Sequence, residues 1–158
     1  MNELLNLIWI TFLPFLELRA SIPYGIFKTN MNWFLIFTVC VATNVILGAI
    51  LYPLLDKIIK IATKIKVIDR IWQKYIEKMQ KKINKYVEKY GEFAVAVFIG
   101  IPLPGSGVYS GAIAAYLVGL KYKKFMIANI IGVLIAGIIV TIISLTGAQA
   151  FNLFIKPV

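Results

Sequence analysis

Three long stretches without any charged residue constrain the fold of this chain more than any other feature of its sequence. They cover residues 29–55, 93–120 and 125–155. Each is longer than the roughly 20 apolar residues with which a helix crosses the ~30 Å hydrocarbon layer of a bilayer. Apolar residues make up 60% of the chain, whereas soluble domains contain roughly 45–50%. We therefore predict an all-α integral membrane protein in which residues 1–158 form a single membrane domain.

The residue types that are absent or rare exclude several classes of function. The sequence has no histidine and a single cysteine, Cys40. This excludes Ser-His-Asp catalysis and histidine-based zinc sites, and one cysteine builds neither a disulfide framework nor a metal cluster. We expect no enzymatic activity, no metal and no cofactor. We attribute the net charge of +10 to membrane topology and anionic headgroups, not to nucleic acid, because the lysines flank apolar segments.

Two of the apolar segments are uninterrupted, and two contain helix breakers. Residues 31–55 and 125–148 are each predicted to cross the membrane as one helix. The stretches 4–27 and 93–119 are interrupted near their middles, by Pro14 and Pro23 in the first and by Pro102, Pro104, Gly105 and Gly107 in the second. Irregular backbone at membrane depth occurs only where it is buried in protein or lines a polar cavity. We predict that both stretches are re-entrant helical hairpins, which enter and leave the membrane on the same side.

A basic segment separates the two halves of the chain. Residues 56–91 contain no proline, and Gly91 comes only at the end. Apolar residues recur there in steps of three and four between frequent lysines, which predicts a long amphipathic helix. Residues 1–55 and 92–158 then form the two repeats. The helix is either a solvated connector that fixes topology or a surface that binds a partner or anionic lipid.

The distribution of basic residues predicts the orientation in the cell membrane. With two re-entrant hairpins and two crossings, residues 56–92 share one side with the lysines of 121–124. Because basic residues accumulate on the cytoplasmic side, we expect this side to be cytoplasmic and both termini to lie outside.

An internal repeat supports this arrangement. Each half is predicted to contain a broken hairpin, a short polar turn, and a helix with an asparagine, Asn44 in "ATNVILGAI" and Asn129 in "IANIIGVLIAG". Each half crosses once, so the second is inverted relative to the first. Inverted repeats with broken helices are a transporter architecture, with the site at the repeat interface. The two asparagines are expected to make polar contacts between helices.

Glu17 and Arg19 are the two charged residues of the first broken stretch, and ionisable side chains at this depth usually mark a substrate or proton path. They form either a local ion pair in a turn or two separate site groups, since residues i and i+2 face different directions on a helix. Desolvation favours protonation of Glu17 and Arg19 opposes it, which makes Glu17 a candidate for proton coupling. The planar guanidinium of Arg19 suits a phosphate or carboxylate.

The second broken stretch carries no charge. "PLPGSGVYSG" offers backbone amides at Gly105 and Gly107, which allow a ligand to approach closely, and the hydroxyl groups of Ser106, Tyr109 and Ser110. These residues are candidates for substrate binding, although small residues also allow helices of a hairpin to pack closely.

The motifs "ELRASIPYGI", "IPLPGSGVYSGAIAAYLVGL" and "IANIIGVLIAGIIV" resemble those of the small multidrug export protein family, which is grouped with the DedA/VTT superfamily. The resemblance implies two facing re-entrant hairpins and, as in some members, movement of polyprenyl phosphates or phospholipids between leaflets with a cation gradient. The superfamily has arginines in its second hairpin and this chain has none, so phosphate recognition here would rest on Arg19 and backbone amides.

These observations predict a transporter that moves an anionic lipid such as a polyprenyl phosphate between leaflets, coupled to protons or another cation. One alternative is export of small amphipathic cations with Glu17 as the ligand. A second is a non-transporting scaffold that acts through the basic helix. The expected partners are membrane lipid as substrate and anionic headgroups at the basic helix, with a homo-oligomer as an open possibility.

Overall fold

The same order of helices occurs twice along the chain. The computed structural model describes residues 3–14, 16–62, 90–102 and 106–155, and these are helical apart from short connections, with no strand among them. The first half contains α1 (Glu3–Phe12), α2 (Glu17–Lys28) and α3 (Trp33–Ala62). The second half contains a helix at Tyr90–Gly100, then α5 (Val108–Leu117) and α6 (Tyr122–Ile155). Most of the predicted basic helix, residues 63–89, lies outside the described residues.

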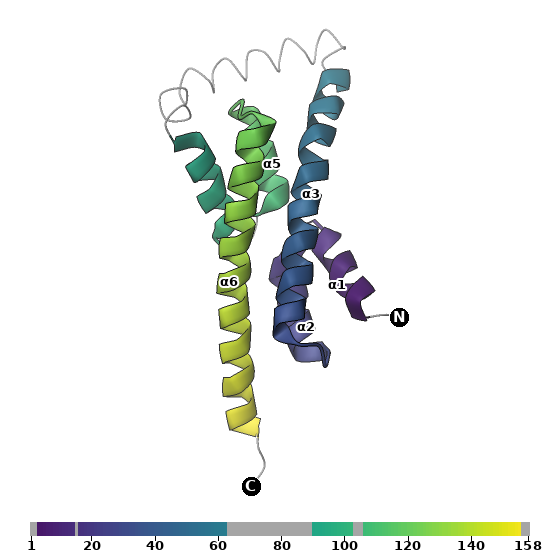
Figure 1. Ribbon diagram of the computed structural model, residues 1–158, viewed down its shortest axis with the longest axis vertical. Coiled ribbons are helices and arrows are strands. Elements are labelled where there is room, and N and C mark those ends of the chain that lie inside the picture. The colour runs from purple at the N-terminus through teal and green to yellow at the C-terminus, as the bar shows by residue number, and fades with distance from the viewer. Residues whose placement is uncertain (1–2, 15, 63–89, 103–105, 156–158) are drawn as a thin grey trace.

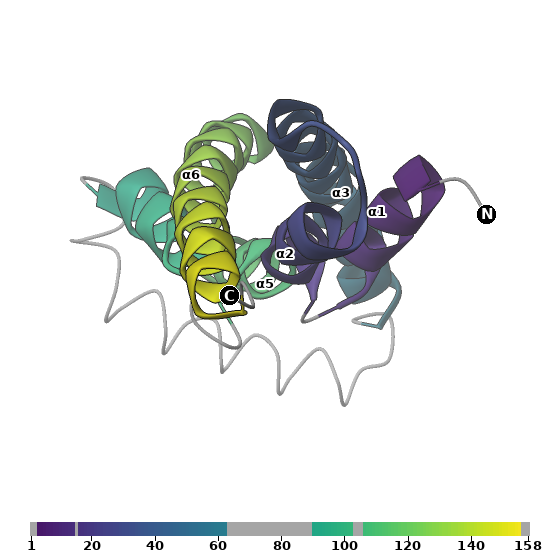
Figure 2. The ribbon, with the colours of Figure 1, turned by 90° about the horizontal axis from the view of Figure 1, so that it is seen from below.

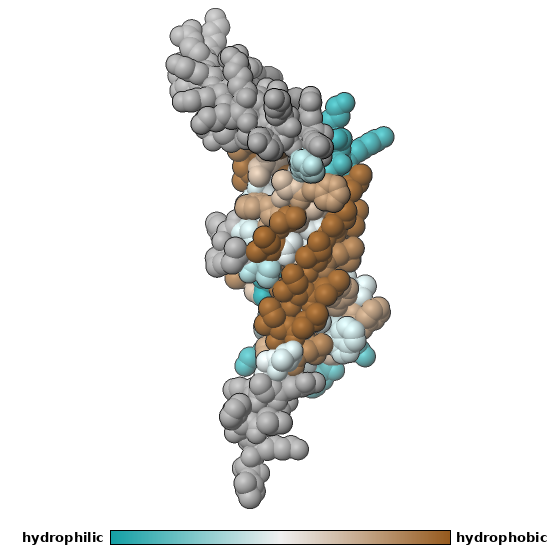
Figure 3. All heavy atoms as spheres, turned by 90° about the vertical axis from the view of Figure 1, so that its left-hand side faces the viewer, coloured by the Kyte–Doolittle hydropathy of each residue, from teal (hydrophilic) through white to brown (hydrophobic). Residues whose placement is uncertain are grey.

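The two long helices have the length and composition of membrane spans. The apolar parts of α3 and α6, Trp33–Ile59 and Tyr122–Gly147, have mean hydropathies of 2.4 and 2.7. Less than half of each apolar stretch is buried, at 39% and 44%, whereas the core helix of a soluble protein is mostly buried. Apolar side chains of α6 cover a broad face of the molecule, with hydrophilic residues toward its ends (Figure 3). The segments predicted at 31–55 and 125–148 are confirmed as long apolar helices: α3 begins at Trp33 and continues to Ala62, and α6 extends past both predicted ends.

The two long helices run in opposite directions and pack against each other. In Figure 1, α3 rises from the α2–α3 turn at the lower end, and α6 descends from the α5–α6 turn at the upper end. Seen from below, α1 lies on the outer side of α3 and the helix Tyr90–Gly100 on the outer side of α6, with α2 and α5 between them (Figure 2). Each half therefore places one short helix outside its long helix and the other near the centre.

The prolines differ in what they do to the helices. Pro14 lies in the break between α1 and α2, and Pro102 lies in the break after Gly100, as predicted. Pro23 was predicted to break the first hairpin, and this is wrong, because it lies inside α2. A proline is tolerated within a helix at membrane depth when neighbouring groups satisfy the carbonyl that loses its N–H donor. Pro104 falls outside the described residues.

An aromatic cluster joins α3 to α5, to the start of α6 and to the turn between them. The ring of Tyr52 stacks on Phe125 with centroids 4.6 Å apart, and it also lies near the rings of Tyr116 and Tyr122. The Tyr52 hydroxyl group donates a hydrogen bond to the carbonyl of Leu120. Because aromatic pairs add stability beyond the area they bury, this cluster fixes where α6 begins relative to α3.

Candidate functional site

The two breaks between short helices, one in each half of the chain, contact each other. The first break, residues 13–16, leads into Glu17 and Arg19 at the start of α2, and the second, residues 101–107, leads into α5. The side chains of Glu17 and Arg19 are only 4% and 14% exposed, and Nη1 of Arg19 lies 3.7 Å from Oε2 of Glu17. The two residues therefore form the local ion pair that was one of the two expectations, and each also binds the second break.

The carboxylate of Glu17 lies at the N-terminus of α5. Its Oε2 accepts a hydrogen bond from the backbone N–H of Val108 at 3.1 Å, and its Oε1 accepts one from Tyr109 at 3.2 Å. The first N–H groups of a helix have no partner within the helix, and the helix dipole places partial positive charge there. A carboxylate supplied from a residue about 90 positions earlier thus satisfies two otherwise unpaired donors.

The guanidinium of Arg19 binds the opposite kind of helix end. Its Nη2 donates to the carbonyls of Ile99 and Ile101, both at 3.1 Å, and these lie at the end of the helix Tyr90–Gly100. Nη1 donates to the carbonyl oxygen of Ser106, and Nη2 also donates to its hydroxyl oxygen. Carbonyls at a helix C-terminus lack intrahelical donors and carry partial negative charge. Each side chain therefore binds a helix end of opposite partial charge: Glu17 binds the N-terminus of α5, and Arg19 binds the C-terminus of the helix Tyr90–Gly100.

Two backbone positions make this contact possible. Gly107 has φ +140° and ψ −168°, a region open essentially only to glycine. A Cβ atom at Gly107 would lie 2.5 Å from Nη1 of Arg19 and 2.5 Å from Oε2 of Glu17. Glu17 itself has φ +47°, which is uncommon for a residue other than glycine. The strain at Glu17 is offset by the bonds that its carboxylate makes.

The structure brings together several of the predicted substrate-binding residues. Ser106 and Gly107 contact the Glu17–Arg19 pair, and Tyr109 contributes its N–H to Glu17. The Tyr109 hydroxyl group donates to the carbonyl of Phe12, the last residue of α1, at 2.5 Å, so it ties the start of α5 to the end of α1.

Two other predicted site residues are placed differently. Ser110 turns back on its own helix, where its hydroxyl group lies 3.4 Å from the carbonyl of Gly107. Gly105 lies outside the described residues.

The predicted asparagine pair lies between the long helices. Asn44 and Asn129 are 1% and 0% exposed. Asn129 Nδ2 donates to the carbonyl of Val45 on α3 at 3.3 Å, and its amide packs directly on Gly48. This is the expected contact between helices for Asn129, and Asn44 is buried one turn from Gly48 on α3.

Taken together, two N–H groups of α5 and the guanidinium of Arg19 surround one anionic group. Helix N-termini and arginine side chains bind carboxylates and phosphates for the same electrostatic reason. We call this group of donors, formed by Val108 N–H, Tyr109 N–H and Arg19, the anion seat. The Glu17 carboxylate occupies it.

The sequence identified Arg19 and the glycine-rich backbone as parts of this site, but it did not identify Val108 or the carbonyls of Ile99 and Ile101. The available signal for Val108 was that a helix begins directly after Gly107, since the first N–H groups of a helix have no partner within it.

One comparison with known proteins gives a match. A family model described as "Putative small multi-drug export protein" matches residues 17–139, from the first residue of α2 into α6. This range is 123 of the 158 residues of the chain (139 − 17 + 1), and it includes Glu17, Arg19, the second break and both asparagines. No curated protein and no solved structure matches the chain.

Proposed function

Because the chain belongs to the small multi-drug export protein family, we propose that this membrane protein is a transporter whose substrate is an anionic amphipathic molecule. A lipid phosphate such as a polyprenyl phosphate fits this description. The observation that carries the proposal is the anion seat, in which Val108 N–H, Tyr109 N–H and Arg19 hold the carboxylate of Glu17. A phosphate oxygen makes the same hydrogen bonds to these donors as a carboxylate oxygen does.

The proposed cycle is a competition between Glu17 and the substrate for the anion seat. When Glu17 is ionised, it fills the seat and balances the charge of Arg19. When Glu17 is protonated, it accepts fewer strong hydrogen bonds, and an incoming phosphate displaces it. Protonation of Glu17 and binding of the substrate both favour the arrangement in which Glu17 has left the anion seat. Because both bind this arrangement better than the other, proton and substrate binding are coupled. In this scheme Glu17 is the proton-coupling residue and Arg19 binds the substrate.

The architecture proposed for this cycle has two inverted repeats with re-entrant hairpins. In its support, α3 and α6 run in opposite directions, and the breaks contact each other through Glu17 and Arg19. Facing broken helices at a repeat interface are where transporters place their substrate sites. The same architecture favours a relation to the DedA/VTT superfamily, which the sequence motifs suggested.

The topology proposed with this architecture has both termini outside and residues 121–124 cytoplasmic, because basic residues accumulate on the cytoplasmic side. The α2–α3 turn after Lys28 and the α5–α6 turn at Lys121 lie at opposite ends of the molecule (Figure 1). Single cysteines at these two positions, in a Cys40→Ala background, should react with a membrane-impermeant maleimide from opposite sides. Reaction of both from the same side would contradict the inverted arrangement.

The second candidate is export of small amphipathic cations, with Glu17 as the ligand. The description of the family favours it, and so does the burial of Glu17 at the contact between the breaks. In this reading a cationic substrate takes the place of Arg19 beside the carboxylate. A scaffold role through the basic helix remains the third proposal, although residues 63–89 fall outside the described part of the chain.

Two variants in proteoliposomes separate the first two candidates. The probes are nitrobenzoxadiazole-labelled phosphatidylglycerol, whose translocation is read by dithionite quenching, and ethidium, whose flux is read by fluorescence. For an anionic substrate, Arg19→Gln should slow lipid translocation at least tenfold, and Glu17→Gln should keep translocation but lose its dependence on a pH gradient. For a cationic substrate, Glu17→Gln should abolish ethidium flux and Arg19→Gln should spare it.

Matched controls keep this test interpretable. Glu3→Gln and Lys28→Gln remove the same charges at exposed positions of α1 and α2, and they should leave both fluxes unchanged. Because Arg19 also binds helix carbonyls, Arg19→Lys is included to keep the charge while losing the planar fork. If Arg19→Gln folds and translocates the lipid at the parental rate, the anion seat is not the substrate site.

A further inference from the structure

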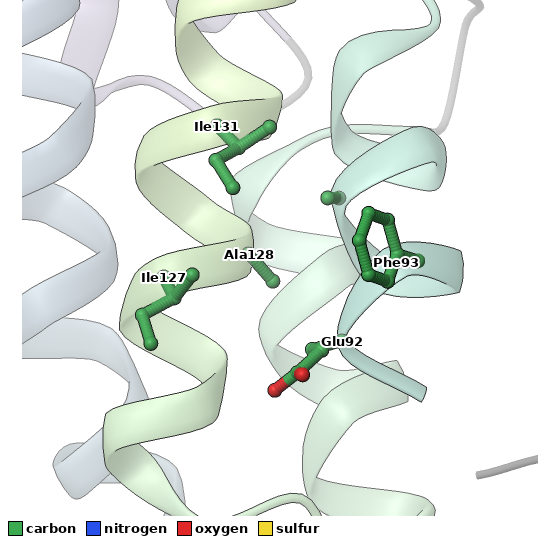
Figure 4. A pocket seen from close by; sticks show the side chains of 6 residues that line it. Glu92, Phe93, Ile127, Ala128 and Ile131 are labelled. Atoms are coloured by element: carbon green, nitrogen blue, oxygen red, sulfur yellow. The ribbon is translucent and has the colours of Figure 1, made fainter. Parts of the chain in front are cut away.

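On the outer side of the molecule, away from the contact between the two breaks, charged and apolar side chains lie next to each other. A groove between the helix Tyr90–Gly100 and α6 is lined by Glu92, Phe93, Ala96, Ile127, Ala128 and Ile131. Its volume is about 100 Å³, which is enough for a few methylene groups, since even a water molecule takes about 30 Å³ in the liquid. In Figure 4 the carboxylate of Glu92 points across the groove toward α6.

An acid and a base lie together at one end of this groove. Nζ of Lys124 is 3.7 Å from Oε2 of Glu92, and both side chains remain accessible, at 49% and 36% exposed. Lys121 and Lys123 are also exposed at the start of α6. Exposed ion pairs contribute little to stability, so this pair is available to exchange its partners for those of a ligand.

The groove has a polar end and an apolar end in the order that a membrane lipid requires. The helix Tyr90–Gly100 and α6 both begin at the upper end of the molecule in Figure 1 and descend from there side by side. Glu92 and Lys124 lie near these starts, and Ala96 and Ile131 lie deeper. Below them, the exposed face of α6 is apolar (Figure 3). Lysines gather where a bilayer places its headgroups, so the apolar end of the groove reaches toward the hydrocarbon layer.

From this arrangement we infer that the groove is a binding site for a zwitterionic phospholipid with a primary ammonium headgroup. The ammonium donates to Glu92, the phosphate accepts from Lys124, and part of one acyl chain lies against Phe93, Ala96 and Ile131. The adjacent opposite charges of the protein match the adjacent opposite charges of the headgroup. A headgroup with a phosphate and no ammonium leaves Glu92 without a cation from the ligand, and an ammonium without N–H groups cannot donate to its carboxylate.

Lipid titrations followed by native mass spectrometry of the purified full chain test this site. The probes are phosphatidylethanolamine, phosphatidylcholine and phosphatidylglycerol with identical acyl chains. We expect phosphatidylethanolamine to bind most tightly. Glu92→Gln and Lys124→Gln should each weaken its binding by about tenfold, as loss of one charge-assisted hydrogen bond predicts. Lys123→Gln removes a neighbouring exposed charge and should leave the affinity unchanged.

A change in the groove itself tests the acyl-chain contact independently of charge. Ile127 is 53% exposed at the groove and Ile138 is 50% exposed elsewhere on α6, so either position accepts a larger side chain without disturbing the core. Ile127→Trp should weaken phosphatidylethanolamine binding, and Ile138→Trp should not. Phosphatidylglycerol is also the probe of the anion seat, so the groove is judged by the effect of its own variants. The inference is overturned if Glu92→Gln weakens phosphatidylglycerol binding as much as phosphatidylethanolamine binding. It is equally overturned if Glu92→Gln or Ile127→Trp binds phosphatidylethanolamine like the parent.

Discussion

The substitution Gly107→Ala tests the contact between the two breaks most directly. The new Cβ atom would lie 2.5 Å from Nη1 of Arg19 and from Oε2 of Glu17, at a position with φ +140°. A side chain in this backbone region costs on the order of 1–3 kcal/mol. Displacing one charge-assisted hydrogen bond of the pair adds roughly 1.5–3 kcal/mol. We expect the free energy of unfolding to fall by about 2.5–6 kcal/mol, which lowers the Tm by roughly 5–24 °C at this chain length.

The chain carries its own reporter for this measurement. Cys40 is its single cysteine and is 0% exposed, so a fluorogenic maleimide reacts only when the helices around Cys40 separate. Heating the purified protein with the maleimide in detergent gives the Tm of the parent and of each variant. Gly147→Ala is the matched control, because the nearest atom to a Cβ there is 4.0 Å away. A Tm for Gly107→Ala within 2 °C of the parent would refute the contact.

Three further predictions use the same thiol assay. Gly48→Ala should lower the Tm, because its Cβ would lie 2.3 Å from Nδ2 of Asn129; the double variant with Asn129→Ala should lower it less than the two single effects combined, since the clash is then absent. Tyr109→Phe should cost about 1 kcal/mol through the lost bond to the Phe12 carbonyl, and an unchanged Tm would mean that this bond does not help to hold α5 against α1. Arg19→Lys should destabilise the fold even though the charge is kept, because one ammonium cannot replace the two nitrogens that bind four acceptors; a parental Tm would show that charge alone suffices.

The sequence was sufficient to predict the elements whose cause is local. The long charge-free runs predicted α3 and α6, because crossing a membrane depends on length and apolarity within one segment. Pro14 and Pro102 marked real breaks for an equally local reason, since proline lacks the N–H that a helix needs. Pro23 has the same chemistry and lies within α2. Whether a proline ends a helix depends on neighbouring groups that satisfy the freed carbonyl, and those groups are set by packing.

Charge patterning also identified Glu17 and Arg19 as the unusual pair, since few ionisable side chains are tolerated at membrane depth. It left open whether they pair with each other, and it predicted that Arg19 binds a substrate without predicting which protein groups Arg19 contacts. The structure engages both of them with helix ends of the other half.

Only the tertiary structure decided which backbone groups meet these two side chains. The N–H groups of Val108 and Tyr109 and the carbonyls of Ile99 and Ile101 lie 80 to 92 positions away along the chain. No periodicity or motif relates such positions, because the donors and acceptors are backbone atoms that every residue possesses. What makes them distinctive is that they stand at helix ends and lack partners there. That property exists only once both breaks have formed and the halves have packed against each other. The charged residues were therefore predictable from the sequence, whereas their backbone partners depend on the tertiary structure.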